Sequence, residues 1–194
     1  MSVLLRRRLF GAFSVLLLSL VASVFIPAGP AQATPWTNVG SKAVSGRFVY
    51  LRDSSGNCMD VELSNAPNGQ KVQQYACQNG PWNQQFQLVS IGTVNSVAAW
   101  RIKPRYNTNK CLDVRDGVTS QFGVPMQVWD CHNGWQQMFR LQVVYNSGTF
   151  IRYWIRPVYN HHCLTTYQQA TMNSPILSYP CNDDLGNQLW YLAY

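Results

Sequence analysis

Charged residues are scarce in this chain of 194 residues. Asp, Glu, Lys and Arg together make up 12% of it, with only 8 acidic residues and 3 histidines. Proteins that bind nucleic acid usually concentrate their basic residues on one face, whereas the Lys and Arg residues after residue 33 lie scattered along the sequence. The low charge and the 13% of aromatic residues predict a surface of Asn, Gln, Ser, Thr and Tyr. Such a surface suits neutral polar ligands and disfavours nucleic acid.

After residue 33 the sequence also lacks any apolar run long enough to span a bilayer. The first 33 residues contain three consecutive arginines, an apolar run over Leu9–Ile26 and a small-residue cleavage site at Ala31–Ala33. This arrangement predicts a secretory signal peptide over residues 1–33, whose removal lowers the formal net charge of +7 by three. An uncleaved membrane anchor is the alternative, and Gly11 and the cleavage site argue against it. We expect a secreted product without a membrane span.

Groups that could act as catalysts or metal ligands are few. His161 and His162 are adjacent, so on a strand they would point to opposite faces, and His132 lies in a loop with Asn and Gly. We expect all three to be solvated. The pair Asp183-Asp184 is more typical of a polar turn than of a metal site. The sequence therefore predicts no enzyme activity, no metal and no cofactor.

Six cysteines all lie beyond the predicted signal peptide, and an even count in an exported chain indicates disulfides. Fifteen pairings are possible for six cysteines. The gaps alternate between about 20 residues and longer stretches, which favours pairing each cysteine with its neighbour across a short gap. The expected bridges are Cys58–Cys77, Cys111–Cys131 and Cys163–Cys181.

The same landmarks recur three times with a period of about 52 residues. Each repeat has a first cysteine opening a four-residue segment, a second cysteine closing an apolar and polar alternation, and a motif with Gln before an aromatic residue. We call the repeats units one, two and three after their cysteine pairs. The closing motifs are Asn83-Gln84-Gln85-Phe86, Gln136-Gln137-Met138-Phe139 and Asn187-Gln188-Leu189-Trp190.

Each unit also begins with a short apolar segment, which gives four expected strands per unit and about twelve in all. These opening segments are Phe48–Leu51, Trp100–Lys103 and Tyr153–Arg156. Gly, Pro, Asn and Asp cluster between the runs, as β-turns require, and no long helical period is present. A unit of about 50 residues cannot bury a core alone, so the three units are expected to close on one another.

On these residues the sequence resembles the ricin B-type lectin domains over residues 47–194. The resemblance implies a β-trefoil of three pseudo-symmetric units, each with a Gln-x-Trp signature and one disulfide. Gln188-Leu189-Trp190 fits the signature, while Phe86 and Phe139 replace its Trp at a position expected to lie in the core. Residues 34–46 are expected to form a linker or an N-terminal arm.

The resemblance also implies a sugar site in each unit. The site combines an Asp two residues after the first cysteine, a Gln and an aromatic residue four and two residues before the second, and the amide pair of the closing motif. A carboxylate can accept hydrogen bonds from adjacent hydroxyls, and an aromatic face can hold the C–H side of a sugar. Unit one supplies Asp60, Gln73, Tyr75, Asn83 and Gln84. Unit two supplies Asp113, Gln127, Trp129, Gln136 and Gln137.

Unit three has Thr165 and Leu177 in place of the Asp and the Gln, although Tyr179, Asn187 and Gln188 remain. We therefore expect little or no binding in unit three. The resemblance implies a secreted, non-catalytic lectin for galactose-type or related glycans or polysaccharides. Galactose, N-acetylgalactosamine, xylan and mannose specificities all occur on this scaffold.

Two other functions remain open at this point. The chain could be a binding or delivery subunit of a secreted toxin or enzyme complex, with Thr34 to Gly46 docking a protein partner. It could also be a protease inhibitor, as other trefoils are, although the retained Asp, Gln and aromatic set argues against that.

Overall fold

The structure is a computed structural model that describes residues 46–63, 65, 67–117, 121–148, 150–167, 171–182 and 186–194. These residues form twelve strands and short 3₁₀ turns. In unit one the strands are β1 (Phe48–Asp53), β2 (Cys58–Val61), β3 (Gln70–Tyr75) and β4 (Gln85–Val94). In unit two they are β5 (Val97–Pro104), β6 (Lys110–Val114), β7 (Val124–Asp130) and β8 (Phe139–Asn146). In unit three they are β9 (Ile151–Pro157), β10 (His162–Thr166), β11 (Ile176–Pro180) and β12 (Trp190–Ala193).

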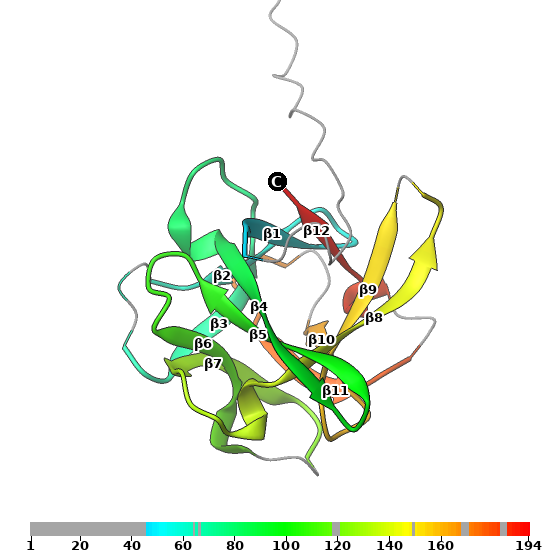
Figure 1. Cartoon of the computed structure of the whole chain (residues 1–194). Coiled ribbons are helices and arrows are strands. Elements are labelled where there is room, and N and C mark those ends of the chain that lie inside the picture. The colour runs from blue at the N-terminus through cyan, green and yellow to red at the C-terminus, as the bar shows by residue number, and fades with distance from the viewer. Residues whose placement is uncertain are drawn as a thin grey trace, which may run out of the picture. The chain divides into compact units, whose positions relative to one another are not determined.

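The first and fourth strands of the three units close a six-stranded barrel. The pairs β1–β4, β4–β5, β5–β8, β8–β9, β9–β12 and β12–β1 are all antiparallel and form one cycle. The first and last strands therefore lie side by side, as Figure 1 shows. Closure leaves the barrel without a free edge strand.

The second and third strands of each unit form three equivalent hairpins, β2–β3, β6–β7 and β10–β11. These hairpins also contact one another: β3 pairs with β7, β7 pairs with β11, and a bridge joins Gln73 to Pro175. A six-stranded barrel capped by three hairpins is a β-trefoil. The expected all-β fold with twelve strands is therefore confirmed.

The core is built from the same positions in each unit. The closing-motif aromatics Phe86, Phe139 and Trp190 are all fully buried, which confirms the expected core role of the Phe substitutions. Trp190 Nε1 also donates a hydrogen bond to the Leu164 carbonyl at 2.8 Å. The two Phe residues have no such donor, so only unit three needs an acceptor at this depth.

The disulfides join the ends of each hairpin. Cys58–Cys77, Cys111–Cys131 and Cys163–Cys181 are formed, with Cα–Cα distances of 4.9, 5.1 and 5.0 Å. The expected neighbour pairing is confirmed. Among the residues that the structure describes, no helix is long and apolar enough to cross a membrane. The expected signal peptide, most of the expected arm at 34–46 and the Asp183-Asp184 pair lie outside the described residues.

Candidate functional site: pockets on the hairpins of units one and two

A fully buried glutamine supports each hairpin. Its side-chain Nε2 donates to the side chain two residues after the first cysteine and to the backbone carbonyl just before the second cysteine. Its Oε1 accepts from the backbone N–H of the residue after that cysteine. The glutamines are Gln84, Gln137 and Gln188, and their side-chain partners are Asp60, Asp113 and Thr165, each at 3.0 Å. A 3₁₀ turn before each fourth strand places the glutamine: Trp82–Gln84, Trp135–Gln137 and Gly186–Gln188.

This burial restricts what the predicted residues Gln84 and Gln137 can do. Neither side chain has surface for a ligand, so each acts by fixing the Asp beside it. They are positioning residues for the carboxylates of Asp60 and Asp113. The sequence pattern could not distinguish this role from direct contact with a ligand, because both roles require the same amide.

In unit one, the strand register brings Asp60 opposite Gln73 on the β2–β3 hairpin. Gln73 Nε2 donates to Asp60 Oδ1 at 3.1 Å, and Asn83 Nδ2 donates to Asp60 Oδ2 at 2.9 Å. Among the described residues the other amide atom, Gln73 Oε1, has no hydrogen-bond partner although it is buried. Asp60 therefore lies fixed at the base of a pocket that still holds an unused acceptor.

We call this the unit one pocket. It brings together four of the five predicted residues, with Tyr75 at its side, and adds three that sequence reasoning missed. The residues lining it are Asp60, Glu62, Gln73, Tyr75, Gln78, Asn83 and Asn173. Asn173 comes from unit three, so the pocket forms only when the trefoil closes.

Unit two repeats the arrangement with one change. Gln127 Nε2 donates to Asp113 Oδ1 at 2.9 Å, and Trp129 is 40% exposed at the pocket wall. In this unit, however, Gln127 Oε1 accepts a hydrogen bond from Arg115 Nε at 3.2 Å. The acceptor that remains unused in unit one is thus occupied here. The lining of this unit two pocket is Asp113, Asp116, Gly117, Gln127, Trp129, His132 and Gln136.

The fourth predicted residue of unit two behaves differently from its counterpart in unit one. Asn83 bonds its carboxylate directly, whereas Gln136 makes no hydrogen bond to Asp113 and its Oε1 has no partner among the described residues. His132 lies at the carboxylate instead, with Nε2 3.6 Å from Asp113 Oδ2. In unit two the imidazole therefore takes the place beside the carboxylate that Asn83 holds in unit one.

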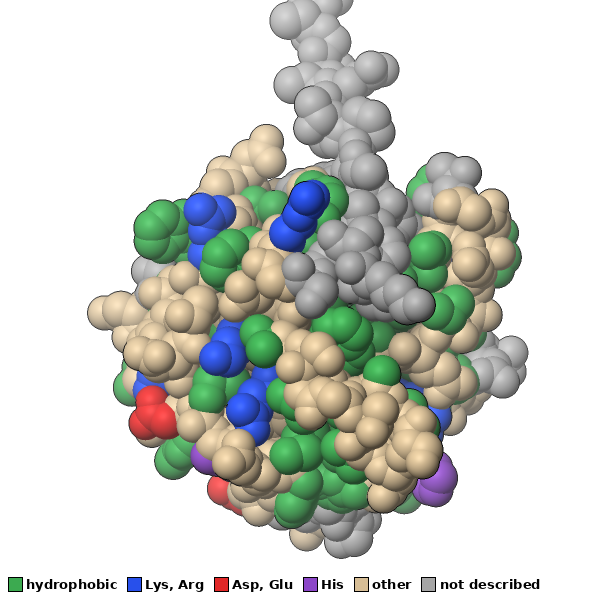
Figure 2. Space-filling view, in the orientation of Figure 1, with side chains coloured by type: hydrophobic (Ala, Val, Ile, Leu, Met, Phe, Trp, Pro, Cys, Tyr) green, Lys and Arg blue, Asp and Glu red, His purple; other side chains and the backbone are tan. Residues whose placement is uncertain are grey.

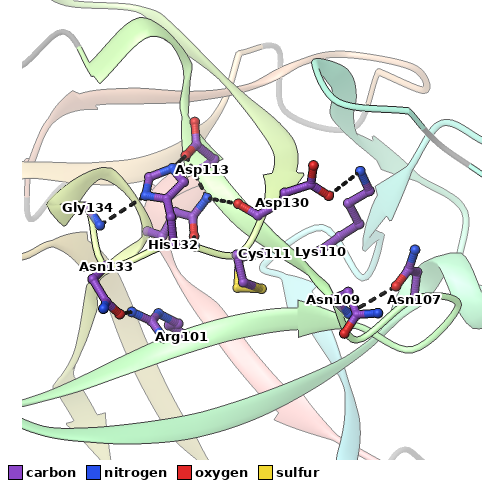
Figure 3. Close-up of a disulfide and its surroundings, with 12 residues drawn as sticks. Arg101, Asn107, Asn109, Lys110, Cys111, Asp113, Asp130, His132, Asn133 and Gly134 are labelled. Carbon is purple, nitrogen blue, oxygen red and sulfur yellow. Dashed lines mark hydrogen bonds and ion pairs between the residues drawn. A yellow bond between two sulfur atoms is a disulfide. The ribbon is translucent and has the colours of Figure 1, made fainter.

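Figure 3 shows the His132 ring between Asp113 and Gly134. The backbone N–H of Gly134 donates to His132 Nδ1 at 2.9 Å, so Nδ1 must be unprotonated. Nε2 is the ring nitrogen that faces Asp113. His132 is 37% exposed at its side chain, as a solvated residue would be, and it also lines the unit two pocket. His162 was likewise expected to be solvated and is buried, with Nδ1 3.1 Å from the Ser178 hydroxyl.

His132 directly follows the second cysteine of its unit, and Gln78 holds the same place in unit one. Both backbone N–H groups donate to the buried glutamine, which turns both side chains toward the pocket. Alignment on the cysteines could have identified this position, because it recurs at a fixed place in the repeat.

Burial is the largest influence on both carboxyl groups, and it raises the pKa of Asp60 and of Asp113 above the usual Asp value. Hydrogen bonds from Gln84 and Gln73 oppose this rise in the pKa of Asp60. Gln127, Gln137 and His132 oppose it in the pKa of Asp113. Each pocket thus contains a carboxylate whose ionised form depends on the amides around it.

Unit three keeps the buried glutamine, Gln188, but has no carboxylate for this glutamine to bond. Gln188 donates to the Thr165 hydroxyl, which in turn donates to the Cys163 carbonyl at 3.0 Å. Leu177 faces Thr165 in the register position of Gln73 and Gln127. Asn187 donates to the Thr166 carbonyl at 2.9 Å. The Asn187 amide therefore bonds a backbone carbonyl, and no charged acceptor lies at the position that Asp60 and Asp113 hold in the other units.

The face in Figure 2 carries only isolated basic and acidic side chains, separated by uncharged polar and apolar surface. Among the described residues, no group of three or more His, Cys, Asp or Glu side chains is placed to hold a metal ion. The two pockets are uncharged apart from their carboxylates and, in unit two, the nearby Arg115. Their carboxylate acceptors and amide groups can form hydrogen bonds with hydroxyl groups.

A closed trefoil with a braced carboxylate on two of its hairpins defines a class of small binding domains. Residues 98–194 match the model of the ricin-type β-trefoil lectin domain, and residues 36–129 match that of the ricin-type β-trefoil lectin domain-like family. The chain belongs to the ricin-type β-trefoil lectin family. No curated protein matches the sequence.

Solved structures with the same fold include the designed three-fold symmetric protein ThreeFoil. It is 25% identical with a TM-score of 0.66, and the alignment covers 76% of this chain and 98% of ThreeFoil. The Macrolepiota procera ricin B-like lectin in complex with lactose is 14% identical with a TM-score of 0.59, over 77% of this chain and 96% of the lectin. The exo-β-1,3-galactanase from Clostridium thermocellum is 22% identical with a TM-score of 0.62, over 75% of this chain and 30% of the enzyme.

Proposed function

We propose that the protein is a secreted, non-catalytic lectin that binds galactose-type or related neutral glycans in the unit one and unit two pockets. The observation that carries this proposal is the matching geometry of Asp60 and Asp113. Each is buried, each accepts hydrogen bonds from two glutamines, and each lies in a pocket with an aromatic residue. Unit three keeps the glutamine brace and lacks the carboxylate, so the carboxylate is not needed for the fold.

In the unit one pocket, the Asp60 carboxylate supplies acceptors for two neighbouring sugar hydroxyls. Gln73 Oε1 has no exposed surface, so Gln73 contributes by fixing this carboxylate through its Nε2. Asn83 also bonds Asp60 directly, whereas Gln136 makes no hydrogen bond to Asp113 in the unit two pocket. Unit one is therefore expected to be the stronger site.

Tyr75 and Trp129 supply the aromatic faces. They stand opposite the first cysteines in the register of their hairpins, two residues from the Gln that bonds the carboxylate. The apolar C–H side of a galactose-type ring can lie on such a face while its hydroxyls reach the carboxylate. Each shallow pocket alone is expected to bind at about millimolar strength. Two pockets on one rigid domain raise avidity for a multivalent glycan surface.

Three disulfides favour an oxidising compartment, which supports secretion. The lactose complex of the Macrolepiota procera lectin supports a galactose-type ligand on this fold. The delivery-subunit alternative draws support from the mosquitocidal holotoxin, in which a matching trefoil accounts for 17% of the chain. Its docking segment, Thr34 to Gly46, lies almost wholly outside the described residues.

The test of the proposed function is a glycan array probed with the purified chain from Thr34 to Tyr194. We expect retention on glycans that end in or contain galactose-type residues, and calorimetry with free galactose should give a dissociation constant of about millimolar. A folded protein that binds no glycan would overturn the lectin proposal and favour the delivery-subunit function.

Glycan affinity is expected to fall on acidification while the protein remains folded. The sugar hydroxyls donate to ionised Asp60 and Asp113, so protonation removes their acceptor. Because burial raises both pKa values, the loss should begin above pH about 3.9, the usual Asp value. The contribution of these two carboxyl groups to the unfolding free energy should change in the opposite direction. A carboxyl whose pKa is higher in the folded than in the unfolded protein destabilises the fold at pH above its unfolded pKa, and this penalty disappears as the pH falls.

Calorimetry with galactose and urea unfolding, both repeated between pH 7 and pH 4, separate these two effects. Affinity that stays constant down to pH 4 would contradict the role of the two carboxylates. Loss of binding that follows loss of structure would also contradict it.

The substitution Gly134→Ala is expected to weaken unit two specifically. The Gly134 backbone is extended (φ −69°), so alanine fits the chain, but a Cβ there would lie 2.6 Å from His132 Nδ1 and 2.5 Å from Gln136 Oε1. Both side chains must move, which displaces the imidazole from Asp113. In an Asp60→Ala background we expect severalfold weaker galactose binding by calorimetry. The matched control is Pro81→Ala, at the same position in unit one, which should leave unit two unchanged. Unchanged affinity in Gly134→Ala would show that His132 does not shape the pocket.

A further inference from the structure

A second hollow adjoins the unit one pocket and shares two residues with it. This Trp82 groove is lined by Glu62, Leu63, Pro81, Trp82, Asn83 and Tyr106, and Glu62 and Asn83 also line the unit one pocket. Its volume of about 690 Å³ lies within the range of about 300 to 1,000 Å³ typical of ligand sites. The two hollows therefore form one continuous surface.

The groove exposes large apolar side chains. Trp82 is 55% exposed and Leu63 is 51% exposed. An indole held in water at the edge of a polar pocket is costly unless a ligand covers it. Because the groove is continuous with the Asp60 pocket, its natural occupant is the next ring of the same sugar chain.

Unit two differs from unit one at the tryptophan beside its pocket. Trp82 and Trp135 begin equivalent 3₁₀ turns. The Trp135 ring packs edge to face against Tyr159 and lies close to Gly117. The tyrosine equivalent to Tyr159 beside Trp82 is Tyr106, which lines the open groove.

The residue before each tyrosine accounts for the difference. Beside Trp135 it is Val158, which is buried, whereas beside Trp82 it is Arg105. The Arg105 guanidinium lies 5.1 Å from the Trp82 ring centroid and 5.1 Å from that of Phe48. This cation–π contact holds the indole at the surface and fixes its orientation before a ligand arrives.

Glu62 supplies polar contacts between the two hollows. Its carboxylate is held by Lys71 Nζ at 3.1 Å and by Gln70 Nε2 at 2.7 Å, and it still has lone pairs for a hydroxyl of either ring. The carboxylates of Asp60 and Glu62 are balanced by Lys71 and Arg105, so the surface carries little net charge. The groove is thus suited to an uncharged ring.

We propose that unit one binds a neutral oligosaccharide of at least two rings, with one ring on Asp60 and the next on Trp82 in the groove. This rests on the proposed lectin function and deepens it, because it assigns unit one to the interior or end segment of a glycan chain rather than to a single terminal sugar. Unit two, with its groove filled by Trp135, binds a single ring.

The test uses the Asp113→Ala variant of the full mature chain, in which unit one is the remaining site. Calorimetry compares galactose with β-1,4-galactotriose, and xylose with xylotriose. We expect the trisaccharide of the recognised series to bind about 3- to 10-fold more tightly than its monosaccharide. Adding Trp82→Ala should remove this gain and leave monosaccharide affinity unchanged, while Trp82→Phe should restore part of it.

The matched control is Trp135→Ala in the same background. It removes a packed tryptophan from unit two and should lower the melting temperature without altering unit one affinity. Equal binding of monosaccharide and trisaccharide overturns the two-ring proposal and leaves the lectin function standing, as does a Trp82→Ala variant that weakens both alike. A wild-type chain that binds no sugar of either series overturns both proposals together.

Discussion

The double substitution Asp60→Ala and Asp113→Ala is expected to reduce glycan binding below detection and to leave the fold intact. Each alanine removes the charged acceptor of its pocket, and hydrogen bonds to charged groups are worth about 1.5 to 3 kcal/mol. That loss lowers the affinity of each pocket about 10- to 100-fold. From a starting affinity of about millimolar, neither pocket would then bind measurably. The measurements are glycan-array retention and calorimetry with galactose.

The two single variants should separate the sites. Because Asn83 bonds Asp60 directly and Gln136 does not bond Asp113, unit one is expected to be the stronger site, and Asp60→Ala should cause the larger loss of monovalent affinity. Asp113→Ala should lower retention on a multivalent glycan surface more than it lowers the affinity for free galactose, because it removes the second contact of a bivalent domain.

Thr165→Ala is the matched control for both aspartates. Thr165 holds the equivalent position, is equally buried and accepts the same kind of hydrogen bond from Gln188. Its loss should affect the unfolding free energy in the same way, by about 1 to 3 kcal/mol, without changing glycan binding. If Thr165→Ala weakened glycan binding as much as Asp60→Ala does, the carboxylates would be structural and the site assignment would be wrong.

The fold could be predicted from the sequence because its constraints repeat. Three cysteine pairs at similar spacing fixed three equivalent hairpins, and a unit of about 50 residues required its neighbours to complete a core. The buried Phe86 and Phe139 stand where Trp190 stands, as the resemblance to the Gln-x-Trp signature implied once the three units were aligned.

The site could be predicted only where one strand register determines it. Asp60 faces Gln73 and Asp113 faces Gln127 because the hairpin registers place Cys58 opposite Tyr75 and Cys111 opposite Trp129. These pairs were implied by the resemblance to the lectin family, since the cysteine spacing alone does not set that register. The role of His132 depends on a loop that turns its ring back toward Asp113, and Gly134 permits that turn. Such a contact follows from side-chain packing, which periodicity does not encode.

The Trp82 groove could not be predicted from the sequence for the same reason. Trp82 and Trp135 are equivalent in the alignment, yet one is exposed and the other is packed against Tyr159. The difference arises from Arg105 and Val158, which lie about 23 residues away along the chain from the tryptophans they affect. Repeats predict what the units share, whereas binding specificity depends on where they differ.

Trp190→Ala is expected to cost about 3 to 5 kcal/mol of unfolding free energy, which is a large part of the stability of a domain this size. Trp190 is fully buried, so its removal leaves a cavity at the closure of the barrel, where β12 pairs with β1 and β9. It also leaves the Leu164 carbonyl without the indole donor. Urea unfolding of the wild type and the variant measures the difference.

Trp190→Phe separates the two contributions, because it reproduces the residue that units one and two already carry. It keeps most of the buried ring and loses the hydrogen bond to Leu164, so we expect a cost of about 1 to 3 kcal/mol. Trp82→Ala is the control for an exposed tryptophan and should stay within about 0.5 kcal/mol of the wild type. Equal losses in Trp190→Ala and Trp82→Ala would mean that barrel closure does not depend on the third signature residue. Such a result would contradict the three-fold core on which both pockets rest.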